Sequence, residues 1–178
     1  MKTILETPRL LVREMDMTDI DFVAEHLADP DVMQYWPRPH TRAEAEAWVH
    51  RQQERYARDG FGYWLALERA TGRPVGQVGL LSHVVDDRPE VDLGWIIHRP
   101  FWRQGYATEG GAACRDLAFR TLDVPRVVAL VRPENLPSQG VARKLGMAPV
   151  SRTIFADLEH IVFEQRRPHA EAPYTQNS

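Results

Sequence analysis

The stretch RPFWRQGYATEGGAACRDLAF, Arg99–Phe119, decides how this chain folds. A strand-like run, VDLGWII, ends just before it. An elbow of basic and aromatic residues follows, and helical spacing then runs from about Thr108 to Leu122. Another strand-like run, Arg126–Val131, comes directly after the helix. Because a strand–helix–strand unit places its two strands parallel in one sheet, the stretch predicts an α/β arrangement in this half of the chain.

Hydrophobic patterns on either side of this stretch supply the other strands. Alternating or continuous apolar runs bounded by turn residues predict further strands at Arg9–Met15, FGYWLAL from Phe61, VGQVGLL, Val150–Phe155 and His160–Arg166. The runs from Phe61 to VDLGWII follow one another through short turns, which is typical of antiparallel neighbours. We therefore expect a mixed sheet of six or seven strands in one α/β (α+β) domain.

Three more helices are predicted from caps and periodicity. Thr18 is a candidate N-cap for a short helix, and Thr41 with Glu44 forms a capping box for the longest one. A helix from Ser138 to Leu145 ends at Gly146, a good C-terminal cap. With the 108–122 helix these cover both faces of the sheet. We expect a domain over 1–167 and a flexible tail over 168–178.

Composition limits the partners. The 178 residues carry a net charge of −3 and have a pI near 6.2, so neither nucleic acid nor an anionic membrane is attracted to the whole surface. No apolar run is long enough for a membrane span, and Cys114 alone cannot form an internal disulfide. The histidines lack metal-ligand spacing, so no metal is expected. A cytoplasmic location is the expectation.

The elbow before the 108–122 helix has the setting of an anion site, because unpaired N–H groups and the helix dipole meet there. Its first carboxylate is Glu109. It does not match a P-loop, since Gly111 and Ala112 stand where Lys and Ser/Thr are needed, and it lacks the Gly-x-Gly of a dinucleotide fingerprint. The alternative is that Gly105 only allows close packing of the helix.

A second polar segment, VRPENLPSQGVARKLGM, follows the 126–131 strand. Asn135 and Ser138 lie at the strand exit, and Arg143 and Lys144 lie near the end of the next helix. Two consecutive strand-to-helix exits meet at one edge of an α/β sheet, where ligands bind. The alternative for Ser138 is a plain N-cap.

The paired motifs LGWIIHRPFWRQGYATEGG and NLPSQGVARKLGM resemble the GNAT N-acetyltransferases, specifically the RimJ/RimL-type ribosomal-protein branch. The similarity runs from TPRLLVRE to the final strand. It implies a sheet splayed between its fourth and fifth strands, with acetyl-CoA in the splay. The backbone contacts to the cofactor that it implies come from Trp95, Ile96, Ile97, His98, Arg103, Gln104, Gly105, Tyr106, Ala107 and Thr108. Asn135, Ser138 and Arg143 are implied as further cofactor contacts.

The chemistry of amide formation suggests the catalytic groups. An amine that is mostly protonated at pH 7 needs a base, and the departing thiolate needs a proton. Glu90 and Asp92 project to one face of a strand, and Asp92 matches the family's acidic position but is one methylene shorter, which favours a relaying water. Glu90 is alternatively a solvated hairpin residue. The family's general-acid tyrosine is replaced by Ala142, so Ser138 is the candidate proton donor.

The acceptor side is less defined. Trp36, in QYWPRPHT, is a candidate wall of the acceptor site, with Tyr35 and Trp64 as weaker candidates; packing is the alternative. The resemblance implies an N-acetyltransferase that acts on a primary amine, either a protein N-terminus or a small molecule, by direct attack in a ternary complex. A non-catalytic acyl-CoA-sensing module is the competing hypothesis. A homodimer is common among such folds, and the oligomeric state stays open.

Overall fold

The computed structural model describes residues 1–168, which contain one eight-stranded sheet in the order β1-β2-β3-β4-β5-β6-β8-β7. The strands are β1 (Thr3–Glu6), β2 (Leu10–Arg13), β3 (Tyr63–Glu68), β4 (Pro74–Val85), β5 (Arg88–Ile97), β6 (Arg126–Val131), β7 (Ala148–Phe155) and β8 (Leu158–Arg166). The mixed α/β fold is confirmed, with one strand more than expected. The extra strand is β1, a four-residue edge strand that pairs antiparallel with β2 and is too short to show a period.

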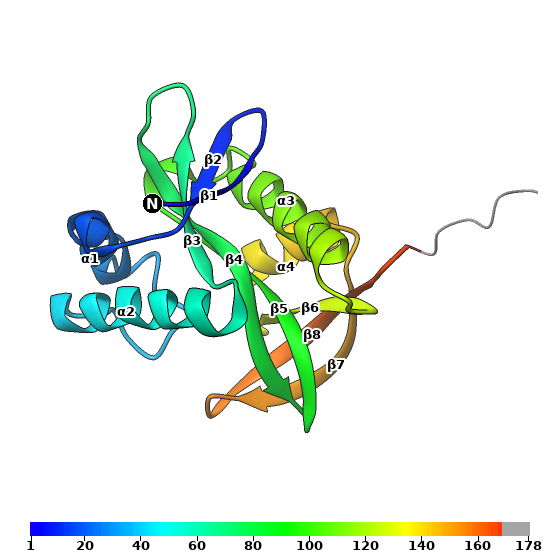
Figure 1. Cartoon of the computed structure of the whole chain (residues 1–178). Coiled ribbons are helices and arrows are strands. Elements are labelled where there is room, and N and C mark those ends of the chain that lie inside the picture. Colours follow the sequence, from blue (N-terminus) through cyan, green and yellow to red (C-terminus); the bar gives the residue numbers. More distant parts are fainter. Residues whose placement is uncertain (169–178) are drawn as a thin grey trace, which may run out of the picture.

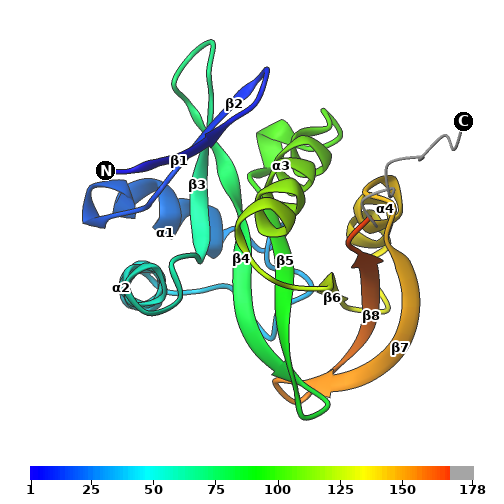
Figure 2. The same ribbon diagram turned by 45° about the vertical axis from the view of Figure 1, so that its right-hand side comes forward.

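Helices cover both faces of the sheet (Figures 1 and 2). They are α1 (Ile20–Ala28), α2 (Arg42–Asp59), α3 (Tyr106–Thr121) and α4 (Leu136–Lys144), with short 3₁₀ turns at η1 (Met17–Asp19) and η2 (Arg99–Phe101). One core cluster joins α1 and α2 to one face of β3–β5. A second cluster joins α3 and α4 to the other face. Because successive side chains of a strand point to opposite faces of the sheet, β3, β4 and β5 contribute residues to both clusters.

The predicted cap is confirmed at α2, whereas the first helix has a different cap from the predicted one. Thr41 accepts a hydrogen bond from the Glu44 N–H, and Glu44 accepts one from the Thr41 N–H, which is the expected capping box of α2. At the first helix the cap is Asp16, and Thr18 donates to Asp16 instead of capping. Asp16 starts a 3₁₀ turn that leads into α1, so the cap lies two residues before the expected one and the chain becomes helical at Met17.

The sheet opens between β5 and β6. These two strands run parallel and share one registered pair, Asp92 with Val128, whereas β6 and β8 share six pairs. In chain order, β5 and β6 are the fourth and fifth of the strands that the sequence predicts. Beyond Asp92 the ladder ends and the two strands diverge toward their C-terminal ends, which is the expected splay.

The predicted tail over 168–178 lies outside the described residues except for Pro168. Within residues 1–168, no helix is both long enough and apolar enough to cross a membrane.

A fully buried histidine lies under the junction of α1 and the end of β5. His26 stacks on Phe22 with ring centroids 5.4 Å apart and meets the His98 ring edge-on at 5.7 Å. Burial, helped by His98, lowers the pKa of His26 to about 3, against the weaker opposing effects of the Ile96 backbone and Asp29. His26 is therefore neutral in the folded chain at physiological pH.

This buried imidazole predicts a loss of stability in acid. The unfolded chain binds a proton at His26 below about pH 6.5, whereas the folded chain does not until about pH 3. The free energy of unfolding should therefore fall between these values, with a loss from this group of about 2 kcal/mol at pH 5. Urea titrations from pH 7 to 5 should give a flatter pH dependence for His26→Leu than for the wild type. The exposed His50 offers the control, His50→Gln, and equal slopes in all three proteins would contradict the prediction.

Candidate active site

The elbow between β5 and α3 is built from left-handed backbone. Arg103 has φ 60° and Gly105 has φ 85°, so two left-handed residues lie directly before α3, which begins at Tyr106. Glycine adopts this conformation without the penalty that a Cβ brings, which explains Gly105 at the N-cap of α3. Residues 102–105 are all exposed, so the elbow lies at the surface of the protein.

The N-terminus of α3 has no side-chain cap. Its N-cap is Gly105, and the first helical backbone bond runs from the Glu109 N–H to the Gly105 carbonyl. The N–H groups of Tyr106, Ala107 and Thr108 thus precede the helical ladder, where the helix dipole is positive. Glu109 turns away to Arg9. This end of α3 fits an anionic group such as a pyrophosphate.

The second polar segment meets the first across the splay. The Trp95 indole N–H on β5 donates to Ser138 Oγ on α4 at 3.2 Å. Asn135 is the N-cap of α4, and its Oδ1 accepts from the Ser138 N–H at 3.0 Å. The capping role considered for Ser138 therefore belongs to Asn135, and the Ser138 side chain is directed to β5 instead. The two motifs of the sequence lie side by side in the fold.

The register of β5 determines which backbone groups face the splay. The His98 N–H donates to the Val75 carbonyl, and Gly76 lies opposite Ile97. Because backbone groups alternate in direction along a strand, Ile96 directs its N–H to β4, whereas Trp95 and Ile97 direct theirs to the splay. Of the backbone contacts that the resemblance implies here, those of Trp95 and Ile97 can therefore face the splay, whereas those of Ile96 and His98 face β4. The Ile97 carbonyl is already held by the Trp102 indole at 2.6 Å.

Asp92 is located where β5 and β6 part. Its Oδ1 accepts from the Leu130 N–H at 3.1 Å, and its Oδ2 lies 3.3 Å from His83 Nδ1 on β4. The His83 ring packs on Phe155 with centroids 4.7 Å apart. Asp92 is 7% exposed, so this pair lies at the inner end of the splay. From the sequence, His83 is expected to flank the cleft but to lie at the surface; its contact with Asp92 was not predicted, because it depends on the β4–β5 register.

Glu90 has a different environment from Asp92. Arg126 contacts both of its carboxylate oxygens, and the same guanidinium also pairs with Glu164 on β8. Glu90 is 9% exposed. Both oxygens are thus engaged in an ion-pair network that joins β5, β6 and β8 below the splay.

Aromatic side chains continue from the α1–α2 loop to β3. The rings of Trp36 and Trp48 meet edge-on with centroids 5.9 Å apart, and the ring centroids of Trp48 and Tyr63 are 5.5 Å apart. Trp36 is 36% exposed, and Tyr35 beside it is half-buried. Trp64 belongs to the core on the opposite face, under α3, so strand alternation places Tyr63 rather than Trp64 with Trp36.

The other residues considered at the sequence level are placed as follows. Arg143 is exposed on α4, bonds to Gln139 and lies over the Phe163 ring. Cys114 is buried in the core, and burial raises the pKa of its thiol. Within residues 1–168, no three His, Cys, Asp or Glu side chains gather as they would around a metal ion. Two surface hollows, one beside Phe61 and Leu117 and one beside Met1 and Tyr56, lie away from the splay.

Comparison with known proteins agrees with this geometry. Residues 9–148 match the acetyltransferase (GNAT) domain family. The chain belongs to the GNAT acetyltransferases. A protein of Bacillus subtilis (strain 168), YkkB, is 32% identical to this GNAT chain over 147 residues, which are 82% of this chain and 86% of YkkB.

Two solved structures extend the comparison. An acetyltransferase from Agrobacterium tumefaciens str. C58 has a TM-score of 0.78 and 27% identity, and the match covers 94% of this GNAT chain and 95% of that one. RimL, the ribosomal L7/L12 α-N-protein acetyltransferase, in complex with coenzyme A, has a TM-score of 0.76 and 15% identity, with 93% and 98% covered. The second likeness shows the same fold.

The capping role of Asn135 predicts a stability effect. Asn135→Ala should lower the free energy of unfolding by about 1 kcal/mol, because the Ser138 N–H loses its acceptor. Asn135→Asp keeps an oxygen at this place and should retain most of the stability. Urea unfolding of the three proteins measures both effects. Equal stability of the Ala variant and the wild type would contradict the capping role.

Proposed function

We propose that this GNAT protein is an acetyl-CoA-dependent N-acetyltransferase that transfers the acetyl group to a primary amine by direct attack in a ternary complex. The observation that carries the proposal is the uncapped N-terminus of α3 next to the splay of β5 and β6. The N-terminus of α3 holds an anionic group, and the splay offers unpaired strand edges within reach of Ser138 and Asp92. The coenzyme A complex of RimL supports a cofactor of this kind for the same fold.

Bound acetyl-CoA would supply the activated acetyl group. In the proposal, the backbone amides of residues 103–107 and Thr108 hold the pyrophosphate. Of residues 95–98, the backbone groups of Trp95 and Ile97 face the splay and hydrogen-bond the pantetheine arm, and the backbone N–H of Trp95 is the donor that polarises the thioester carbonyl. Asn135 and Arg143 complete the cofactor contacts from α4.

Ser138 is the proposed proton donor to the thiolate. An indole N–H can only donate, so Ser138 Oγ is the acceptor in its bond with Trp95. The hydroxyl hydrogen of Ser138 is then free to donate elsewhere. Because Trp95 belongs to the strand edge that faces the splay, this hydroxyl is held beside the place where the thioester is proposed to lie.

Asp92 and His83 are the proposed proton acceptor for the amine. A primary amine is mostly protonated at pH 7 and has to lose a proton before it attacks. Asp92 Oδ1 is occupied by Leu130, so the proton reaches the Oδ2 side, where His83 shares it directly or through a water. Glu90 is not assigned this role, because Arg126 engages both its oxygens.

The acceptor is proposed to be a protein N-terminal α-amine, with a small-molecule amine as the second class. The resemblance to the ribosomal-protein branch supports the first, and Trp36 with Tyr35 is the proposed wall of the acceptor site. Release of free CoA thiol from acetyl-CoA, measured with peptides and small amines, tests the proposal. Thermal stabilisation by acetyl-CoA without thiol release for any acceptor would favour an acyl-CoA-sensing module instead.

Removal of the Ser138 hydroxyl should slow turnover. General-acid assistance contributes about 10²-fold or more, so Ser138→Ala should lower kcat by about that factor and leave the KM for acetyl-CoA nearly unchanged. The Ser138 N–H still reaches Asn135, so α4 keeps its cap. Steady-state kinetics on both substrates measures the split. A wild-type kcat in this variant would remove Ser138 from the mechanism.

Neutralising Asp92 should affect the pH profile as well as the rate. Asn at this position can still accept from the Leu130 N–H, so Asp92→Asn should fold, but it cannot take a proton. We expect kcat/KM for the amine to fall by about 10²-fold and its acidic limb to change. The acetyl-CoA dissociation constant is the control and should stay constant. An unchanged pH–rate profile would contradict the assignment.

A further inference from the structure

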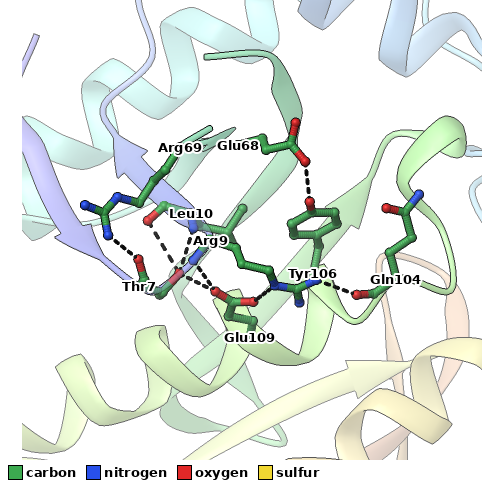
Figure 3. Close-up of polar contacts among 8 residues, drawn as sticks. All are labelled: Thr7, Arg9, Leu10, Glu68, Arg69, Gln104, Tyr106 and Glu109. Carbon is green, nitrogen blue, oxygen red and sulfur yellow. Dashed lines mark hydrogen bonds and ion pairs between the residues drawn. The ribbon is translucent and has the colours of Figure 1, made fainter. Parts of the chain in front are cut away.

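The turn between β1 and β2 reaches the elbow through Arg9 (Figure 3). Arg9 Nη1 donates to the Gln104 carbonyl at 2.9 Å, and Arg9 Nε donates to Glu109 Oε2 at 2.6 Å. One guanidinium therefore joins the left-handed elbow to the first turn of α3. No other element within residues 1–168 bonds to the Gln104 carbonyl.

Glu109 fixes this guanidinium from the α3 side. Its Oε1 accepts from Thr7 Oγ1 at 2.6 Å and from the Arg9 N–H at 2.9 Å, in addition to the Arg9 side chain (Figure 3). Partial burial opposes ionisation, but these bonds hold the pKa of Glu109 below its usual value. A carboxylate in the first turn would otherwise compete with an anionic ligand, and here Arg9 neutralises it.

Tyr106 and Gly105 fix the guanidinium from the other directions. The Arg9 guanidinium carbon lies 4.4 Å from the centre of the Tyr106 ring, and the Tyr106 hydroxyl donates to Glu68 at 2.5 Å (Figure 3). A Cβ on Gly105 would lie 3.3 Å from Arg9 Nη2, so the guanidinium is in close contact with the elbow backbone. Arg9 is thus held at its position by contacts within the chain itself.

The contact between Arg9 and the Gln104 carbonyl also determines the direction of the Gly105 N–H. In a planar trans peptide, the carbonyl and the N–H point in opposite directions. Because Arg9 holds the Gln104 carbonyl, the Gly105 N–H is directed to the other side of the elbow. We propose that Arg9 is a positioning residue that fixes the elbow amides for the pyrophosphate of the acyl donor, and that the β1–β2 turn is thereby part of the donor site.

This inference rests on the proposed function, and it predicts different effects on two parts of the acyl donor, the pyrophosphate and the thioester. Arg9 acts only on the part of the site that would hold the pyrophosphate, and Ser138 and Asp92 lie on other elements. Loss of Arg9 should therefore weaken the use of acetyl-CoA and spare S-acetylpantetheine, a thioester donor without the pyrophosphate. General damage to the fold would affect both donors.

The test compares Arg9→Ala and Arg9→Lys with a matched control. Arg69→Ala removes another arginine that bonds to the same turn, through the Thr7 carbonyl at 2.9 Å, without contacting the elbow. We expect kcat/KM for acetyl-CoA to fall by about 10-fold or more in Arg9→Ala, mainly through KM, because charge-assisted hydrogen bonds are lost. Lys keeps the charge but cannot bond Gln104 and Glu109 as a fork, so it should recover only part of the loss.

Equal losses with acetyl-CoA and S-acetylpantetheine, or equal effects of Arg9→Ala and Arg69→Ala, would overturn the inference. A separate calorimetric measurement compares the binding of CoA and of pantetheine to the wild type and to Arg9→Ala. It needs no turnover, so it also tests the inference if no amine is acetylated, which is the result that would contradict the proposed function. A CoA affinity unchanged by Arg9→Ala would overturn the inference in that case.

Discussion

The hydrogen bond between Asp92 and the Leu130 N–H is the interaction on which the arrangement around the splay depends. β5 and β6 stop pairing after Asp92 and Val128, and the next outward N–H of β6 loses its strand partner. A buried N–H without a partner costs about 1–3 kcal/mol. The carboxylate of Asp92 replaces the missing strand, so the sheet can open here without leaving that group unsatisfied. The opening in turn frees the backbone groups of Trp95.

The two helices that follow the splay strands, α3 and α4, differ in how the N–H groups at their N-termini are satisfied. α4 satisfies its N-terminus internally through Asn135. α3 leaves its N-terminus uncapped and directs the only acidic side chain of its first turn, Glu109, to Arg9. Unsatisfied N–H groups at the surface are tolerated because water binds them, and an anion can take the place of that water. This difference between the helices supports the proposal that α3, and not α4, holds the anionic part of the ligand.

Local signals in the sequence predict the fold well. The strand–helix–strand unit, the capping box at Thr41 and the strand periodicity all depend on residues close in sequence, and all are present. The strand β1 was missed because four residues at an edge carry no period. At the first helix, Asp16 and Thr18 are both residue types that cap helices well, so the sequence alone did not show which of them is the cap.

The site is less predictable because its geometry depends on register. Which of Ile96 and Trp95 faces the splay, and whether His83 reaches Asp92, follow from pairing between strands that no local pattern specifies. Tyr63 and Trp64 differ only by one position in alternation, yet they lie in different cores. The contact of Arg9 with Glu109 joins residues one hundred positions apart.

The same register connects the aromatic face to the splay. A Cβ on Gly94 would lie 2.2 Å from the Tyr63 hydroxyl, so the ring of Tyr63 occupies the space that any other residue would need. Tyr63 also contacts Trp48, which contacts Trp36. The aromatic series therefore ends on the backbone of β5 between Asp92 and Trp95.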